Sequence, residues 1–127
     1  MVKALQQAVA RILVVDDEAA DRQLFRKILE KGGHSVAESS SGQEALRAIQ
    51  KTPFELMILD LSMPETDGFE VLRVVRSQQP QLKTIAVSGL MQGRLLDSAK
   101  ILGATATLEK LMAQDLLLTM VNRLLQV

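Results

Sequence analysis

Five short apolar runs alternate with segments whose apolar residues recur at helical spacing, and this alternation constrains the fold most. The runs are RILVV, SVAES, LMIL, TIAV and ATLE, at residues 11–15, 35–39, 56–59, 84–87 and 106–109. Strands that are apolar along nearly their whole length are typical of parallel sheets with helices on both faces. The pattern therefore predicts a doubly wound α/β fold with a five-stranded parallel sheet and five helices.

The segments between the runs carry helix start and stop signals. A first helix includes residues 24–29 and ends at Gly32-Gly33. Ser41 and Glu44 fit a capping box that opens a second helix. That helix continues to about residue 51, and the others are predicted over 67–77, 94–102 and 114–126. We expect one domain over residues 11–127, after a leader over residues 1–10.

Composition excludes several classes of function. Apolar residues make up 47% of the 127 residues, and 15 basic residues balance 15 acidic ones. A chain without net charge has no general attraction to nucleic acid or to a membrane surface. Cysteine, a long apolar span and a signal-peptide pattern are also absent from the sequence, which favours the cytoplasm. The single histidine, His34, follows a Gly-Gly pair and is predicted to be exposed.

Polar side chains follow the predicted strands where each strand ends. Asp16 and Asp17 follow the first strand and Asp60 the third, while Ser88 and Lys110 follow the fourth and fifth. In doubly wound sheets, ligands bind at the carboxyl ends of the strands, where the strand order reverses. With the order 2-1-3-4-5, the first and third strands are neighbours, so the three aspartates meet there.

Three clustered carboxylates need a compensating positive charge. Two unit charges about 4 Å apart interact by about 4 kcal/mol at an effective dielectric constant of 20. Mg²⁺ suits such a site because it prefers hard oxygen ligands and one or two carboxylates, and it retains several waters. Lys110 would supply a fixed positive charge. The sequence therefore predicts a Mg²⁺ site formed by Asp16, Asp17 and Asp60.

The motifs VVDDE, LMILDLSMPETDGFEVL, VSG and LGA, with the lysine near the end, resemble a known family. They are similar to the receiver domain of bacterial two-component response regulators, over about residues 11–126. The resemblance implies a flavodoxin-like fold with strand order 2-1-3-4-5. It also implies a signalling domain rather than an enzyme, whose own phosphorylation and dephosphorylation are the most that it catalyses.

The resemblance also implies the role of each acidic residue. Asp60 would accept a phosphoryl group from a phosphohistidine on a sensor histidine kinase or phosphotransfer protein. Asp17, Asp60 and the backbone carbonyl of Ser62 would ligate Mg²⁺, and Asp16 would act mostly through water. The output would be a downstream protein target or a homodimer formed through the fourth and fifth helices.

Further roles implied by the family concern the residues around the phosphoryl group. Lys110 would pair with Asp60 and then with the phosphate, while Ser88 would hydrogen-bond a phosphate oxygen and draw the next loop inward. Met63-Pro64 and Asp67-Gly68 would shape the loop beneath the site, with Gly68 tolerating a positive φ.

Two positions depart from the family pattern. The aromatic residue that usually lies three positions before the lysine is replaced by Thr107, and the proline that usually follows the lysine is replaced by Leu111. Thr107 is either a silent replacement or a hydroxyl partner for Ser88. A cis bond before a non-proline residue costs about 2.5–4 kcal/mol, so we expect a trans Lys110–Leu111 bond and a displaced Lys110.

The positions that flank the path of the hydrolytic water in this family are Ser62 and Leu90 here. Neither side chain carries a carboxylate or an amide that would orient the water. We therefore expect slow self-dephosphorylation.

The last helix carries more apolar residues than a helix covering a sheet needs. They are Leu116, Leu117, Leu118, Met120, Val121, Leu124 and Leu125. At 100° per residue they spread over roughly 200°, whereas a covering helix needs somewhat more than about 100°. The excess indicates either unusually deep packing or a surface for a partner or a second copy.

Two other classes of function compete with a phosphorylated receiver domain. A phosphorylation-independent interaction module is favoured by Thr107 and Leu111, and opposed by the complete set of aspartates. An enzyme of similar fold is the other class. A phosphatase usually carries Asp-x-Asp after its first strand, and a flavin phosphate would be repelled by the acidic segment DDEAAD.

Overall fold

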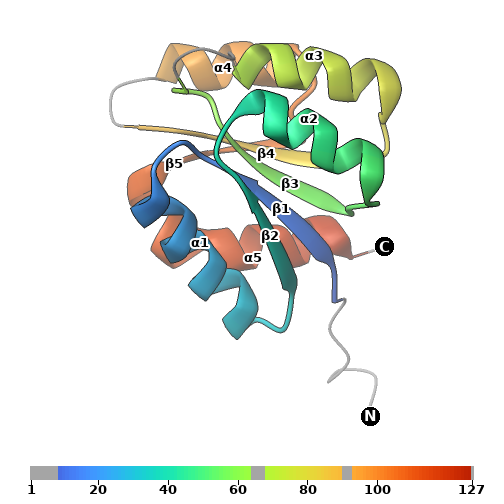
Figure 1. Cartoon of the computed structure of the whole chain (residues 1–127). Coiled ribbons are helices and arrows are strands. Elements are labelled where there is room, and N and C mark those ends of the chain that lie inside the picture. Colours follow the sequence, from blue (N-terminus) through green and yellow to red (C-terminus); the bar gives the residue numbers. More distant parts are fainter. Residues whose placement is uncertain (1–8, 64–67, 90–92, 127) are drawn as a thin grey trace.

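The computed structural model describes residues 9–63, 68–89 and 93–126. Five strands form one parallel sheet in the order β2-β1-β3-β4-β5, which confirms the predicted fold (Figure 1). The strands are β1 (Arg11–Val15), β2 (Ser35–Ser39), β3 (Leu56–Asp60), β4 (Lys83–Ser88) and β5 (Ala106–Glu109). Each corresponds to one predicted apolar run, and β3 and β4 extend to include Asp60 and Ser88.

Helices cover both faces of the sheet (Figure 1). One face carries α1 (Ala19–Lys31) and α5 (Ala113–Leu125). The other carries α2 (Gly42–Lys51), α3 (Gly68–Gln78) and α4 (Gly93–Ile101). A short 3-10 helix over Lys110–Met112, which the sequence did not predict, joins β5 to α5. None of the described helices is both long and apolar enough to span a membrane.

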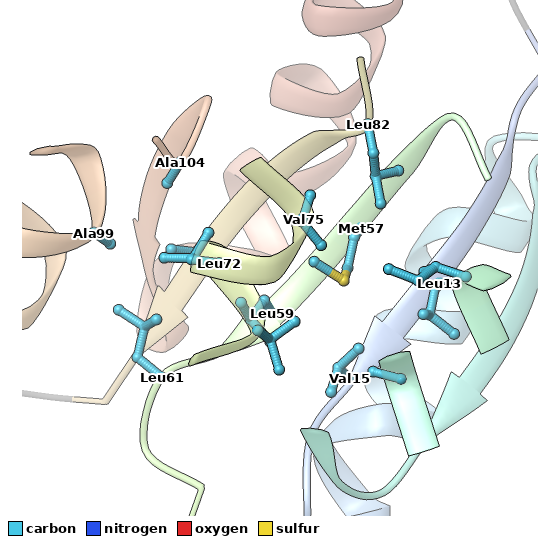
Figure 2. Packing of buried hydrophobic residues seen from close by; sticks show 14 of the residues in the cluster. Leu13, Val15, Met57, Leu59, Leu61, Leu72, Val75, Leu82, Ala99 and Ala104 are labelled. Carbon is cyan, nitrogen blue, oxygen red and sulfur yellow. The ribbon is translucent and has the colours of Figure 1, made fainter. Parts of the chain in front are cut away.

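The strands divide their side chains between two apolar clusters because successive residues of a strand point to opposite faces. Leu13, Met57 and Leu59 pack with Leu72 and Val75 of α3 (Figure 2). On the opposite face, the second cluster joins alternate strand residues to α1 and α5. It includes Ile12, Val14, Ile58, Ile85, Phe25, Leu29, Leu117 and Val121. The central strands are therefore buried on both faces, as their continuous apolar runs indicated.

His34 is buried, so the prediction that it is exposed was wrong. Only 4% of its surface is accessible. Nδ1 accepts a hydrogen bond from the Ala10 amide at 3.1 Å, and Nε2 lies 3.0 Å from Asn122 Oδ1 of α5. The imidazole thus connects the chain before β1 to the last helix, and both partners are distant in sequence.

Candidate functional site

The loop after β1 holds Asp16 through backbone groups. The Asp16 amide donates to the Ser39 carbonyl at 3.1 Å, and its Oδ1 accepts from the Glu18 amide at 2.9 Å. Arg22 of α1 donates to the Asp16 carbonyl at 2.7 Å and pairs with Glu38 of β2 at 3.0 Å. Asp16 is fully buried. The start of α1 and the edge of β2 therefore fix this carboxylate in position.

Asp60 is held in the same way at the end of the neighbouring strand. Its Oδ1 accepts a hydrogen bond from the Ser62 amide at 2.9 Å, and the residue is 1% exposed. In both aspartates one carboxylate oxygen bonds the amide two residues on, which is a common Asp turn. The register pairs Val15 with Leu59, so the two turns lie side by side where β1 and β3 end.

Lys110 lies beyond the end of β5 and contacts three carboxylates. Its Nζ lies 3.0 Å from Asp16 Oδ2 and 3.5 Å from Asp60 Oδ2. The shortest of the three contacts, 2.7 Å, joins Nζ to Oδ2 of Asp21 in the first turn of α1. Asp21 was not among the site residues predicted from the sequence. Acids are common in the first turn of any helix because they favour the helix N-terminus, so this position gave no specific signal.

Burial and neighbouring charges shift the pKa values of Asp16 and Lys110. Burial raises the pKa of Asp16 from 3.8 to about 6, and the charge of Asp60 adds to this effect, although the Glu18 amide and Lys110 oppose it. Burial alone would lower the pKa of Lys110, but contacts with Asp21, Asp16 and Asp60 raise it above its ordinary value. Lys110 therefore stays protonated, while the site as a whole remains short of positive charge.

The aspartates present a donor set that fits a divalent cation. Carboxylate oxygens of Asp16, Asp17 and Asp60 lie within 4.8 Å of one another. Oδ2 of Asp16 is buried, and its contact with Lys110 is an ion pair that lacks the alignment of a hydrogen bond. Asp17 is exposed, so one side of the cluster is open to solvent. Hard oxygens with an open side suit Mg²⁺, which retains several waters.

Ser88 ends β4, which lies between β3 and β5 in the sheet, and Thr107 lies within β5. Ser88 is fully buried and its hydroxyl donates to the Gly89 carbonyl at 3.3 Å. The register pairs Ser88 with Glu109 and Thr107 with Ala86. Among the described residues, no hydrogen bond joins the Thr107 and Ser88 hydroxyls, so the possibility that they are partners is not supported.

Gly68 shapes the site for a reason other than the expected one. It begins α3 and does not have the positive φ that is found at Gly33 and Gly103, so the conformational prediction was wrong. A Cβ at this position would lie 2.8 Å from the Asp60 carbonyl oxygen and 3.0 Å from Leu61 Cα. Glycine is therefore required because α3 begins against the backbone that carries Asp60.

The Lys110–Leu111 peptide bond is trans, as expected. Pro64, Asp67 and Leu90 lie outside the described residues.

The family follows from a sequence comparison. The sequence model of the family described as "Response regulator receiver domain" matches residues 12–122. The chain belongs to this family. The receiver domain is a signalling domain, and its sheet order, acidic cluster and lysine agree with the resemblance noted from the motifs.

Solved structures of other receiver domains share this fold. The receiver domain of NtrX from Brucella abortus is 32% identical with a TM-score of 0.84, over 88% of this chain and 95% of that chain. The chemotaxis protein CheY4 of Vibrio cholerae is also 32% identical with a TM-score of 0.84, over 93% of this chain and 100% of that one.

Curated relatives include longer proteins. The transcriptional regulatory protein ResD of Bacillus subtilis is 44% identical over 69 residues, which is 54% of this chain and 29% of ResD. The chain thus spans less than a third of that relative.

Proposed function

We propose that Asp60 accepts a phosphoryl group from the phosphohistidine of a sensor histidine kinase or a phosphotransfer protein in the cytoplasm. The observation that carries this proposal is the buried Asp60 carboxylate, 1% exposed and 3.5 Å from the Lys110 ammonium. A carboxylate nucleophile beside a fixed cation is suited to an in-line phosphoryl transfer. The family membership supports the same chemistry.

In the proposed step, a carboxylate oxygen of Asp60 forms a bond to phosphorus while the phosphorus–nitrogen bond of the phosphohistidine breaks. The electron pair of that bond returns to the imidazole. Lys110 offsets the negative charge brought by the phosphoryl oxygens, and the Ser62 amide keeps the Asp60 carboxylate oriented at 2.9 Å. Ser88, buried at the end of β4, would hydrogen-bond a phosphoryl oxygen.

Asp17, Asp60 and the Ser62 carbonyl would hold Mg²⁺, with Asp16 acting through water. The clustered carboxylate oxygens, within 4.8 Å of one another, support this assignment. When bound, Mg²⁺ neutralises charge on the transferring phosphoryl group.

The proposed output is a change in protein contacts made through α4 and α5. The side chains that support a contact surface near α5 are Leu111, Met112 and Leu116, which are 67%, 43% and 41% exposed. Leu116 also lines a groove of about 330 Å³, together with Ala106, Met120 and Leu124 among others. A downstream protein or a second copy would bind here, after the loop that follows Ser88 responds to phosphorylation.

A second candidate function is favoured by Thr107 and Leu111. Thr107 replaces the aromatic residue that usually reports phosphorylation, and Leu111 replaces the proline that usually follows the lysine. The chain would then be an interaction module that does not use phosphate. Partner binding unchanged in Asp60→Asn would support this candidate. Loss of phosphorylation-dependent binding in that variant would exclude it.

Acetyl phosphate with Mg²⁺, followed by intact-mass measurement, tests the phosphoryl proposal. We expect one added phosphoryl group on the wild type, and none on Asp60→Asn or on wild type treated with a chelator. An adduct of equal yield on Asp60→Asn would contradict the assignment of Asp60. No adduct on the wild type at saturating donor would favour the phosphate-independent module.

A further inference from the structure

Asp21 makes the shortest contact of Lys110. Its Oδ2 lies 2.7 Å from Nζ, against 3.0 Å for Asp16 and 3.5 Å for Asp60. The two side chains are partly accessible, at 31% for Asp21 and 20% for Lys110. Asp21 projects from α1, whereas the other two carboxylates belong to the strand ends. The ammonium is therefore drawn toward the helix and away from the nucleophile.

Three ion pairs hold the Lys110 ammonium, whereas the Lys110 backbone is held separately, through a hydrogen bond from the Ala113 amide to its carbonyl. The residue begins a short 3-10 helix, and the side chain that follows it, Leu111, is 67% exposed. Apolar packing therefore does not anchor this segment at Leu111. By contrast, Arg22 next to Asp21 anchors the start of α1 to the Asp16 carbonyl and to Glu38. Asp21 thus stands on a fixed helix start, and the position of the Lys110 ammonium depends on its ion pairs.

A phosphoryl group on Asp60 would compete for the same ammonium. It brings additional anionic oxygens to the position where Lys110 now makes its longest contact, 3.5 Å. Charge-assisted hydrogen bonds to phosphate are strong and short, so Lys110 is drawn toward Asp60 when the phosphoryl group is present. Any such movement weakens the contact of Lys110 with Asp21.

We propose that Asp21 is a positioning residue that holds Lys110 on the α1 side of the unphosphorylated site and opposes its transfer to a phosphoryl group on Asp60. Asp21 acts through Lys110 and touches no reacting atom. This inference rests on the proposed function, because it assumes that Asp60 is the phosphoryl acceptor. Through the contact between Asp21 and Lys110, the first turn of α1 influences how tightly the phosphoryl group is retained.

Beryllofluoride, a phosphoryl analogue, allows a direct test in the presence of Mg²⁺. The chain has neither Trp nor Tyr, so bound analogue is followed by fluorine NMR. We expect Asp21→Asn to bind beryllofluoride about fivefold more tightly than the wild type, the size of effect that loss of a partly exposed ion pair gives. Asp21→Glu keeps the charge and should restore affinity close to that of the wild type.

Glu18→Gln is the matched control. Glu18 is an exposed acid just before α1 whose backbone amide, rather than its side chain, bonds Asp16. Removing its charge changes the net charge near the site by the same amount without touching Lys110. Equal gains in affinity from Glu18→Gln and Asp21→Asn would overturn the positioning role, because net charge alone would then explain the effect.

The Lys110→Ala background separates positioning from other effects. If Asp21 acts through Lys110, Asp21→Asn changes neither the beryllofluoride affinity nor the stability of metal-free protein once Lys110 is absent. A gain that persists without Lys110 overturns the inference, and so does unchanged or weaker binding by Asp21→Asn alone. If the wild type itself binds no beryllofluoride, the proposed function fails and the inference fails with it.

Discussion

The end of β1 and β3 differs from the β4–β5 side of the sheet in how its residues are held. Asp16 and Asp60 are almost fully buried, and backbone amides two residues on orient both carboxylates. On the other side, Thr107 is half-buried on a strand of four residues, and Leu111 is 67% exposed. The first region retains every residue expected of the family, and the second contains both departures.

The contrast suggests that the phosphoryl chemistry and the relay of the signal depend on different parts of the domain. In the proposed function, the chemistry relies on charged side chains at the strand ends, and both Asp16 and Asp60 keep their hydrogen bonds to backbone amides although Thr107 and Leu111 replace the usual residues. The relay of the signal depends on side chains that can move, and Thr107 stands where the family usually has an aromatic ring. Substitutions in the buried region should therefore disturb the chemistry, whereas a substitution on the edge strand should leave it intact.

Gly68→Ala should have the largest effect, because it pushes α3 against the backbone of the nucleophile. A Cβ placed 2.8 Å from the Asp60 carbonyl oxygen forces the helix start or the strand end to shift. We expect a loss of about 2–3 kcal/mol in the free energy of unfolding, typical of overpacking, together with weaker Mg²⁺ binding. Urea denaturation and Mg²⁺ titration measure the two effects.

Gly33→Ala provides the contrasting variant. Gly33 has a φ of +91° but open space where the Cβ would lie, so only backbone strain opposes the methyl group. We expect the free energy of unfolding to fall by about 1–2 kcal/mol without any change in Mg²⁺ affinity. Equal Mg²⁺ affinities in the two variants would show that Gly68 does not support the site.

Asp16→Asn should stabilise the metal-free protein, because it removes a buried charge that the fold disfavours. The raised pKa of Asp16, about 6 against 3.8, corresponds to a gain on the order of 3 kcal/mol at neutral pH. Saturating Mg²⁺ should reduce this advantage, because the wild type binds the cation more tightly. Lower stability of Asp16→Asn in chelator would contradict this account of the site.

The pH dependence of stability follows from the same shift. The folded protein binds a proton at Asp16 more tightly than the unfolded chain between pH 3.8 and about 6. The contribution of Asp16 to the free energy of unfolding therefore falls as pH rises through this window, and is constant above it. The difference between Asp16→Asn and the wild type in chelator should grow from about pH 4 to about pH 6.

Ser62→Asn should shorten the lifetime of the phosphorylated protein severalfold, because an amide at this position can orient the attacking water. The wild type should lose its phosphoryl group slowly in buffer without kinase. Intact mass measured over time after removal of the donor gives both rates. Loss from the wild type within seconds would refute the expected slow hydrolysis.

Thr107→Ala should have the smallest effect and sharpens the contrast between the two regions. Thr107 is paired with Ala86, and no hydrogen bond joins it to Ser88 in the described part of the chain. We expect the rate of phosphorylation by acetyl phosphate to stay within about twofold of the wild type. A loss of phosphorylation in Thr107→Ala would mean that the edge strand takes part in the chemistry.

The fold could be predicted because its signals are local and repeated. Each strand was an apolar run and each helix had a periodic apolar face, so that order alone implied a parallel sheet. The positions of Asp16, Asp60, Ser88 and Lys110 followed from the strand ends. These residues could be expected to lie close together because the carboxyl ends of parallel strands share one edge of the sheet.

The features that were missed depend on contacts between distant segments. His34 is buried because Ala10 and Asn122, 24 and 88 residues away, complete its hydrogen bonds. The contact of Asp21 with Lys110 spans 89 residues and depends on how α1 is rotated against the sheet. Gly68 is needed for a close approach to Asp60, and an interresidue distance of this kind leaves no pattern in the sequence.

The most direct test of the separation between chemistry and relay is to add beryllofluoride and Mg²⁺ to the isotope-labelled protein and follow its backbone amide NMR signals. The account predicts large shifts at Asp16, Asp60 and Ser88, and much smaller shifts at Thr107. A shift at Thr107 as large as that at Asp60 would contradict it, because the edge strand would then respond as strongly as the site itself.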